Sequence, residues 1–175
     1  MTAAAKPLRL FFALWPDDAV RAALTGRAVA IQRVAGGRAT RAESIHLTLA
    51  FLGDVDPGRL DALKSAAAEV SLQPFDLVLD DAGYWKHNRI AWAGATQVPA
   101  ALDRLVAGLR AALAGGQFAF DPKPFVPHLT LVRKARGGSA MPAVVPVRWR
   151  VSDFVLVRSV IGPEGSNYLV EARWR

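Results

Sequence analysis

The sequence predicts an α+β fold in which mainly antiparallel strands and a few helices share one domain. Short apolar segments bounded by glycine, proline or aspartate are mixed with longer segments of helical periodicity, without the regular strand–helix–strand order of a parallel sheet. No low-complexity linker divides the chain. With 175 residues, 52% of them hydrophobic, the chain is long enough to bury a core of its own.

The individual elements follow from composition and periodicity. Runs rich in leucine, valine, isoleucine and phenylalanine predict strands over residues 8–14, 45–52, 75–81, 89–94, 127–133, 151–160 and 167–174. Apolar residues that recur every three or four positions predict helices over 17–34, 58–70 and 98–113. Pro16 with Asp17, and Pro57 with Gly58, are typical helix starts, and a hairpin turn is expected around 86–88.

Composition excludes several classes of protein. The chain has no cysteine, which excludes disulfide bonds, thiolate zinc sites and cysteine nucleophiles and fits a reducing cytoplasm. The apolar run near the N-terminus is broken by Pro16 and followed by two aspartates, unlike a signal peptide. No apolar stretch reaches the roughly 18 residues that a spanning helix needs. We therefore expect a soluble cytoplasmic protein.

The charge of the chain is uneven. The formal net charge is +7; residues 1–87 hold 10 basic and 10 acidic residues, whereas residues 88–175 hold 12 and 5. A basic surface raises the local concentration of polyanions and favours ligands that carry phosphate. Arginine-rich surfaces are also common in proteins from GC-rich genomes, so charge alone leaves both interpretations open.

One tetrapeptide, His-Leu-Thr-Leu, occurs twice, at 46–49 and at 128–131. A threonine two places after two of the three histidines has a probability below about 1% from composition alone. In a strand, residues two positions apart point to one face, so each histidine lies beside its threonine while the leucines point to the core. Packing explains the leucines and gives no reason to keep the histidines and threonines.

Two such strands facing each other would bring two imidazoles and two hydroxyls to one point. Imidazole, with an ordinary pKa near 6.5, can supply both a general acid and a general base around neutral pH. The hydroxyls of Thr48 and Thr130 can donate hydrogen bonds to phosphate oxygens, where charge develops. The pattern indicates an in-line displacement at phosphorus, with His46 and His128 as the general acid and base. Because the two motifs are locally identical, they do not say which histidine is the acid.

The sequence lacks the motifs that other catalytic mechanisms need. His87 has no threonine two places later and lies in the expected hairpin turn, so we interpret it as structural or exposed to solvent. Histidines and carboxylates do not cluster at the spacing of metal ligands. The sequence has no phosphate-binding glycine loop of the Walker or dinucleotide type, and no nucleophile elbow. We expect no metal and no organic cofactor.

The paired HxTx motif resembles that of the two-histidine (2H) phosphoesterases, and the wider pattern looks like the RNA 2′,3′-cyclic phosphodiesterases, which were first described as 2′-5′ RNA ligases. The resemblance covers RLFFAL at 9–14, HLTLAFLG at 46–53, LDDAGYW at 79–85, RIAWAG at 89–94 and KPFVPHLTLVR at 123–133. It implies a bilobal α+β fold over residues 1–175, with two mainly antiparallel sheets flanked by helices. Two pseudo-symmetric lobes would each give one HxTx strand to a central cleft.

The resemblance also implies roles for the motif residues. His46 would be the proton donor and His128 the proton acceptor, while Thr48 and Thr130 would bind phosphate oxygens. Arg133 matches an arginine that looks like a contact to the substrate phosphate. Regular alternation would place Arg133 on the face opposite His128, unless the strand ends or bulges there.

The first strand offers one aromatic ring to each face, through Phe11 and Phe12. One ring can line the cleft and stack on a base while the other packs in the core. Packing of both in the core is the alternative. The family pattern favours Phe12 as the ring that faces the cleft and binds substrate.

We therefore predict a monomeric, metal-independent enzyme that hydrolyses 2′,3′-cyclic phosphate ends of RNA to 2′-phosphomonoesters, with a reversible 2′-5′ RNA ligase activity as a second reaction. Two alternatives stay open. One is a phosphodiesterase for small cyclic phosphates such as ADP-ribose 1″,2″-cyclic phosphate, and the other is a non-catalytic RNA-binding protein. The double motif favours an enzyme, because arginine or lysine would bind phosphate better than histidine does.

Overall fold

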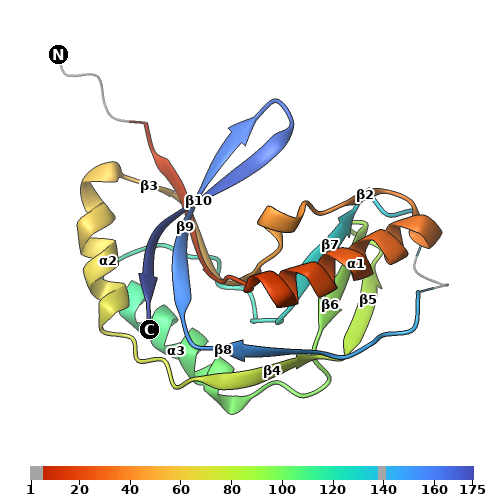
Figure 1. The fold of residues 1–175 in the computed structure, drawn as a ribbon. Coiled ribbons are helices and arrows are strands. Elements are labelled where there is room, and N and C mark those ends of the chain that lie inside the picture. The colour runs from red at the N-terminus through yellow and green to blue at the C-terminus, as the bar shows by residue number, and fades with distance from the viewer. Residues whose placement is uncertain (1–5, 138–140) are drawn as a thin grey trace.

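The computed structural model describes residues 6–137 and 141–175 (Figure 1). Its elements in chain order are β1 Leu8–Leu14, α1 Asp18–Ala35, β2 Arg38–Ala39, the 3-10 helix η1 Ala42–Ser44, β3 Leu47–Val55, the 3-10 helix η2 Pro57–Arg59, α2 Leu60–Ala68, β4 Phe75–Leu79, β5 Asp81–Trp85, β6 Ile90–Gly94, α3 Ala100–Gly115, β7 Leu129–Arg133, β8 Val147–Val151, β9 Phe154–Gly162 and β10 Gly165–Trp174. The predicted α+β fold is confirmed. Strands β2, β5 and β8 are not among the expected segments.

The strands form one large and one small sheet. The large sheet has the order β10-β9-β1-β3-β7-β6-β5, with β2 also paired to β7, and the small sheet pairs β4 with β8. All of these pairs are antiparallel, as predicted. At the centre of the large sheet, β3 and β7 are joined by a single residue pair, Leu47 with Leu129. The two motif strands therefore meet at one point and diverge from it.

The helices cover the two halves of the large sheet separately. Helix α1 packs against β7, β2 and β8, whereas α3 packs against β3 and against α2 (Figure 1). The helix start predicted at Pro16 and Asp17 is confirmed, because the Asp17 side chain accepts a 2.9 Å hydrogen bond from the backbone N–H of Val20. Within the described residues, no helix is both long and apolar enough to cross a membrane.

The core runs through the point where β3 meets β7. The four leucines of the two motifs, Leu47, Leu49, Leu129 and Leu131, are all buried, as the alternation predicted. They belong to one apolar cluster that includes residues of all three helices and both sheets. The strands that carry the motifs are therefore held by the core that joins all three helices to both sheets.

This packing makes a prediction for stability. Leu129→Ala should lower the free energy of unfolding by about 2–5 kcal/mol, because Leu129 is fully buried and its truncation leaves a cavity at the sheet junction. Leu169→Ala is the matched control, since Leu169 is 49% exposed on β10, and should cost no more than about 0.5 kcal/mol. Urea unfolding followed by circular dichroism measures both. Equal losses in the two variants would contradict a central core at this junction.

Candidate active site

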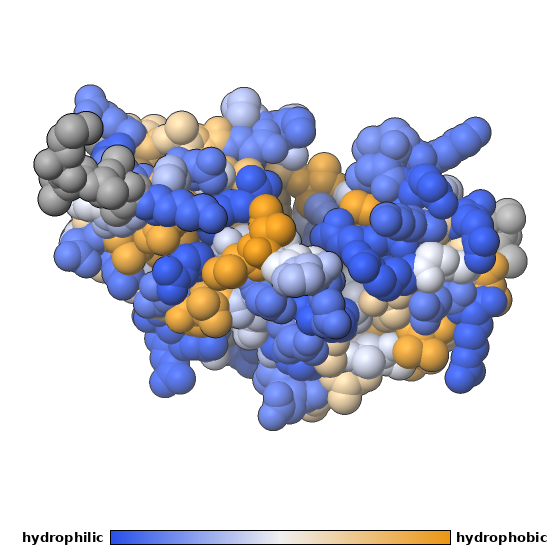
Figure 2. Space-filling view, turned by 90° about the horizontal axis from the view of Figure 1, so that it is seen from above, coloured by the Kyte–Doolittle hydropathy of each residue, from blue (hydrophilic) through white to orange (hydrophobic). Residues whose placement is uncertain are grey.

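A cavity of about 610 Å³ opens between the two halves of the large sheet. Its walls come from β1, β3 and β7, from β2 with the segment that leads into η1, and from the β9–β10 hairpin. Seen from above, the surface is hollowed between the two sides of the molecule, and hydrophilic side chains form most of its border (Figure 2). The cavity is therefore open to solvent and suited to a polar ligand.

The histidines and threonines of both motifs line this cavity. His46 directly precedes β3 and His128 directly precedes β7, so each imidazole lies where its strand begins. The Nδ1 atom of His46 donates to the carbonyl of Ser44 at 2.7 Å, and that of His128 donates to the carbonyl of Val126 at 2.9 Å. Each bond places a proton on Nδ1 of the neutral ring and leaves Nε2 as the nitrogen that can accept one.

Aromatic rings surround His46. The Trp15 ring stacks on it at 5.5 Å between centroids, the Tyr168 ring meets it edge-on at 5.1 Å, and Phe11 lies at 4.9 Å. The Trp85 ring meets His128 in the same edge-on manner, at 4.6 Å. The rings fix the plane of each imidazole and exclude water from part of it.

The pKa of both imidazoles is lowered. Burial lowers the pKa of His46 to about 4, and the positive charges of Arg133, of Arg21 and of His128 when it is protonated act in the same direction. The hydrogen bond to Ser44 opposes this effect. Burial also lowers the pKa of His128, and Arg133 adds to that effect. Both rings are therefore neutral in the free protein at neutral pH.

A cluster of hydrogen-bond donors beside the histidines can hold an anion. Arg38 on β2 lies directly opposite Arg133 on β7, and both side chains line the cavity. Two like charges in this position repel each other, and an anion between them removes the repulsion. Within the described residues, the buried Thr40 hydroxyl has no hydrogen-bond partner, and Thr40 also lines the cavity. Guanidinium and hydroxyl donors of this kind suit a phosphate group.

Arg133 reaches the cavity because β7 bulges. The register with β6 passes from the Thr130–Trp92 pair to the Val132–Ala91 pair and skips Leu131. Leu131 and Val132 are consequently both buried, and Arg133 returns to the face of Thr130. Of the two geometries open to the sequence, the bulged one is present.

The expectation that Phe12 faces the cleft is wrong. Phe12 is 0% exposed and packs against Phe154 and Trp174 in the main core, whereas Phe11 lines the cavity. The phase of β1 explains this: Leu10, Phe12 and Leu14 form its core face, and Arg9, Phe11 and Ala13 form the other. Arg9 could have indicated from the sequence that Phe11 faces the cavity, because a charged residue marks the solvent-facing side of a strand.

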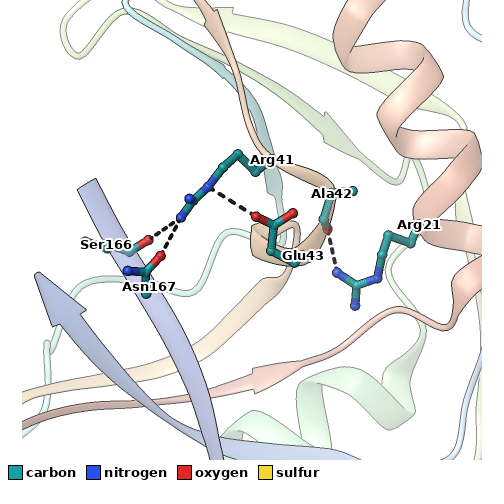
Figure 3. A network of polar contacts seen from close by, with 6 residues as sticks. All are labelled: Arg21, Arg41, Ala42, Glu43, Ser166 and Asn167. Carbon is teal, nitrogen blue, oxygen red and sulfur yellow. Dashed lines mark hydrogen bonds and ion pairs between the residues drawn. The ribbon is translucent and has the colours of Figure 1, made fainter. Parts of the chain in front are cut away.

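The sequence predicted the strands of the β9–β10 hairpin but not that this hairpin forms a wall of the cavity; its turn end extends from the body of the molecule (Figure 1). Arg41, just before η1, donates to the Ser166 carbonyl at 3.1 Å and to Asn167 Oδ1 at 2.8 Å, and pairs with Glu43 at 3.3 Å (Figure 3). These contacts tie β10 to the segment that leads into His46. Nothing in the sequence links positions 125 residues apart.

His87 lies in the turn between β5 and β6 and is exposed, as predicted. Its ring centroid is 6.4 Å from that of Trp85, whereas the Trp85 ring meets His128 at 4.6 Å. Among residues 6–137 and 141–175, no three histidine, aspartate or glutamate side chains lie close enough to hold a metal ion.

Known proteins are similar to this chain in sequence and in fold. The family model described as LigT like Phosphoesterase matches residues 14–92. A protein of Escherichia coli K12 named RNA 2′,3′-cyclic phosphodiesterase is 35% identical, with 97% of each chain covered. A protein of the same name from Thermus thermophilus is 34% identical, with 93% of this chain and 87% of the relative covered.

Solved structures agree with the sequence comparison. The crystal structure of E. coli LigT complexed with 3′-AMP is similar with a TM-score of 0.88 at 33% identity, and covers 97% of this chain and 98% of that one. The likeness therefore includes both motif strands and the cavity between them. The chain belongs to the LigT-like phosphoesterase family, as its two HxTx motifs predicted.

Proposed function

We propose that this chain is an RNA 2′,3′-cyclic phosphodiesterase, which opens the cyclic phosphate at an RNA end and leaves a 2′-phosphomonoester. The observation that carries the proposal is the matched pair of histidines in one cavity, each with Nδ1 bonded to a carbonyl two residues earlier. The names of the E. coli and T. thermophilus relatives support it. So does the nucleotide in the E. coli LigT complex.

In the proposed mechanism the two imidazoles act on opposite sides of phosphorus. Water attacks in line, and its proton passes to Nε2 of His128. The bond from phosphorus to O3′ breaks, and O3′ takes a proton from Nε2 of His46. Thr48, Thr130 and Arg133 donate hydrogen bonds to the non-bridging oxygens, where negative charge increases in the transition state.

Because the pKa of His46 is low in the free protein, the proposed mechanism requires that bound substrate raises this pKa, so that His46 can act as the general acid. At neutral pH the free protein holds His46 neutral, mainly because the ring is buried. A phosphate anion in the cavity offsets the positive charge of Arg133 and favours the imidazolium. Substrate binding is therefore coupled to proton uptake by His46, so that the general acid is protonated in the substrate complex.

The other parts of the proposal follow from the same cavity. One apolar core joins both halves, which supports a single domain of two lobes. This chain supplies both histidines and both threonines of the cavity, so the proposed reaction needs no second subunit, and we propose a monomer. A chain without cysteine has no need of an oxidising compartment, which supports the cytoplasm. Attack by a 5′-hydroxyl in place of water would break the same bond from phosphorus to O3′ and form a 2′-5′ linkage. The arginines at the cavity favour RNA over small cyclic phosphates.

The function is tested by product analysis. Pure protein, incubated in EDTA with a short oligonucleotide that ends in a 2′,3′-cyclic phosphate, should yield a 2′-phosphate, because His46 as acid lies beside O3′ and the imidazoles supply the proton transfers. Chromatography against authentic 2′- and 3′-nucleotides identifies the product. A 3′-phosphate would mean that the two histidines have the opposite roles. Activity that disappears on chelation and returns with one metal would overturn the metal-free mechanism.

The roles of the histidines are tested by substitution. His46→Ala and His128→Ala should each lower kcat by about 100-fold or more, the usual cost of losing a general acid or base. His87→Ala is the matched control and should change kcat by less than about 2-fold, because His87 is exposed in a turn. Circular dichroism of each variant checks that it is folded. Retention of most of the activity by either motif variant would exclude the mechanism.

A further inference from the structure

Phe51 occupies on β3 the place that Arg133 occupies on β7. Each lies five positions after its motif histidine. The register of β3 with β1 skips Leu49, just as the register of β7 with β6 skips Leu131. Each bulge shifts the alternation by one residue, so the fifth residue after the histidine returns to the cleft face. The two strands thus present a ring at one position and a guanidinium at its counterpart.

Phe51 lies outside the main core and packs against the small apolar cluster of Phe11, Ala13, Val155 and Val157. Its neighbours Ala50 and Leu52 are buried, whereas Phe51 is half-buried and lines the cavity. The guanidinium of Arg9, on the adjacent strand β1, lies over the Phe51 ring at 4.9 Å from its centroid. Arg9 is exposed and also lines the cavity. An aromatic ring and a guanidinium plane are the two side-chain surfaces on which nucleobases stack.

The pair lies at a distinct place in the cleft. Strands β3 and β7 are antiparallel and meet at Leu47 and Leu129, so their later residues extend in opposite directions from the threonines. Phe51 therefore lies on one side of the phosphate position and Arg133 on the other. Phe51 lies three positions after Thr48 on β3, or about 10 Å along the strand. Tyr168, whose ring contacts His46, is closer to the reacting nucleoside.

We propose that Arg9 and Phe51 form a stacking subsite for the base of the nucleotide that precedes the cyclic phosphate nucleotide in the RNA. The inference rests on the proposed function and adds a substrate preference to it. The ring and the guanidinium hold the base, and the charge of Arg9 attracts the phosphate that joins the two nucleotides. Every base has a flat face, so the subsite selects for a second nucleotide and not for its sequence.

Three substrates distinguish the contribution of this subsite to kcat/KM from that of the reaction centre. They are a nucleoside 2′,3′-cyclic phosphate, a dinucleotide with the same cyclic end, and that dinucleotide with an abasic first residue. The wild type should have a kcat/KM about 10-fold higher on the full dinucleotide than on the nucleoside, and the abasic dinucleotide should lose most of this gain. Phe51→Ala and Phe51→Leu should abolish the gain and leave the nucleoside rate within about 2-fold. Phe51→Trp should keep it.

Arg9→Ala should reduce the gain and its dependence on salt. Arg59→Ala is its matched control, because that guanidinium lies over the Phe118 ring at 4.0 Å without lining the cavity. Equal losses on all three substrates, or a full gain in folded Phe51→Ala, would overturn the subsite. So would a wild type that does not distinguish the abasic dinucleotide from the full one.

Binding separates a failure of the subsite from a failure of the proposed function. Wild-type turnover of the nucleoside cyclic phosphate tests the reaction alone. Fluorescence anisotropy with a labelled dinucleotide that ends in a 2′-phosphate tests the subsite without turnover, and Phe51→Ala should weaken its affinity by about 10-fold. An unchanged affinity would contradict the inference even in an active enzyme.

Discussion

The burial of four leucines where β3 meets β7 is the constraint on which the site depends. These side chains fill the core around the residue pair that joins the two strands. Because side chains alternate along a strand, the same packing that buries the leucines turns Thr48 and Thr130 into the cavity. The histidines directly before the strands are then fixed by short bonds from Nδ1 to the preceding backbone. The geometry of the candidate site is therefore a consequence of core packing.

The bulges determine what lies beyond each motif. Strict alternation over HLTL predicted the positions of the histidines and threonines, and it holds there because both residues precede the irregularity. Past that point alternation fails, and one extra residue in each strand brings Phe51 and Arg133 to the cleft. The same rule applied to β1 would have identified Phe11, since Arg9 marks its solvent-facing phase. Strand β8, with the sequence VRWRV, also alternates visibly, whereas β2 has two residues and leaves no pattern.

Long-range contacts were beyond reach from one sequence. The tie from Arg41 to the β9–β10 hairpin joins residues about 125 positions apart, and neither partner has a local signature. Regional charge was also a poor guide. Arg9, Arg38 and Arg41 at the cavity come from residues 1–87, which are neutral overall, and Arg133 comes from the basic half. Folding, and not the count of charges along the chain, gathers these arginines around one cavity. The division into two pseudo-symmetric lobes stays a prediction.

The free enzyme should hold two neutral imidazoles and the substrate complex one protonated imidazole, and the pH dependence of the rate tests this most directly. Because kcat/KM reports the free enzyme, it should peak below pH 6.5; it should fall at lower pH as His128 is protonated and at higher pH as His46 loses its proton. The optimum of kcat should lie at higher pH, because bound phosphate raises both pKa values. His46→Ala should remove the alkaline fall and His128→Ala the acid fall. Two results would contradict two-histidine catalysis in this cavity. One is a pH profile that keeps its alkaline fall in His46→Ala or its acid fall in His128→Ala, and the other is an alkaline optimum for kcat/KM.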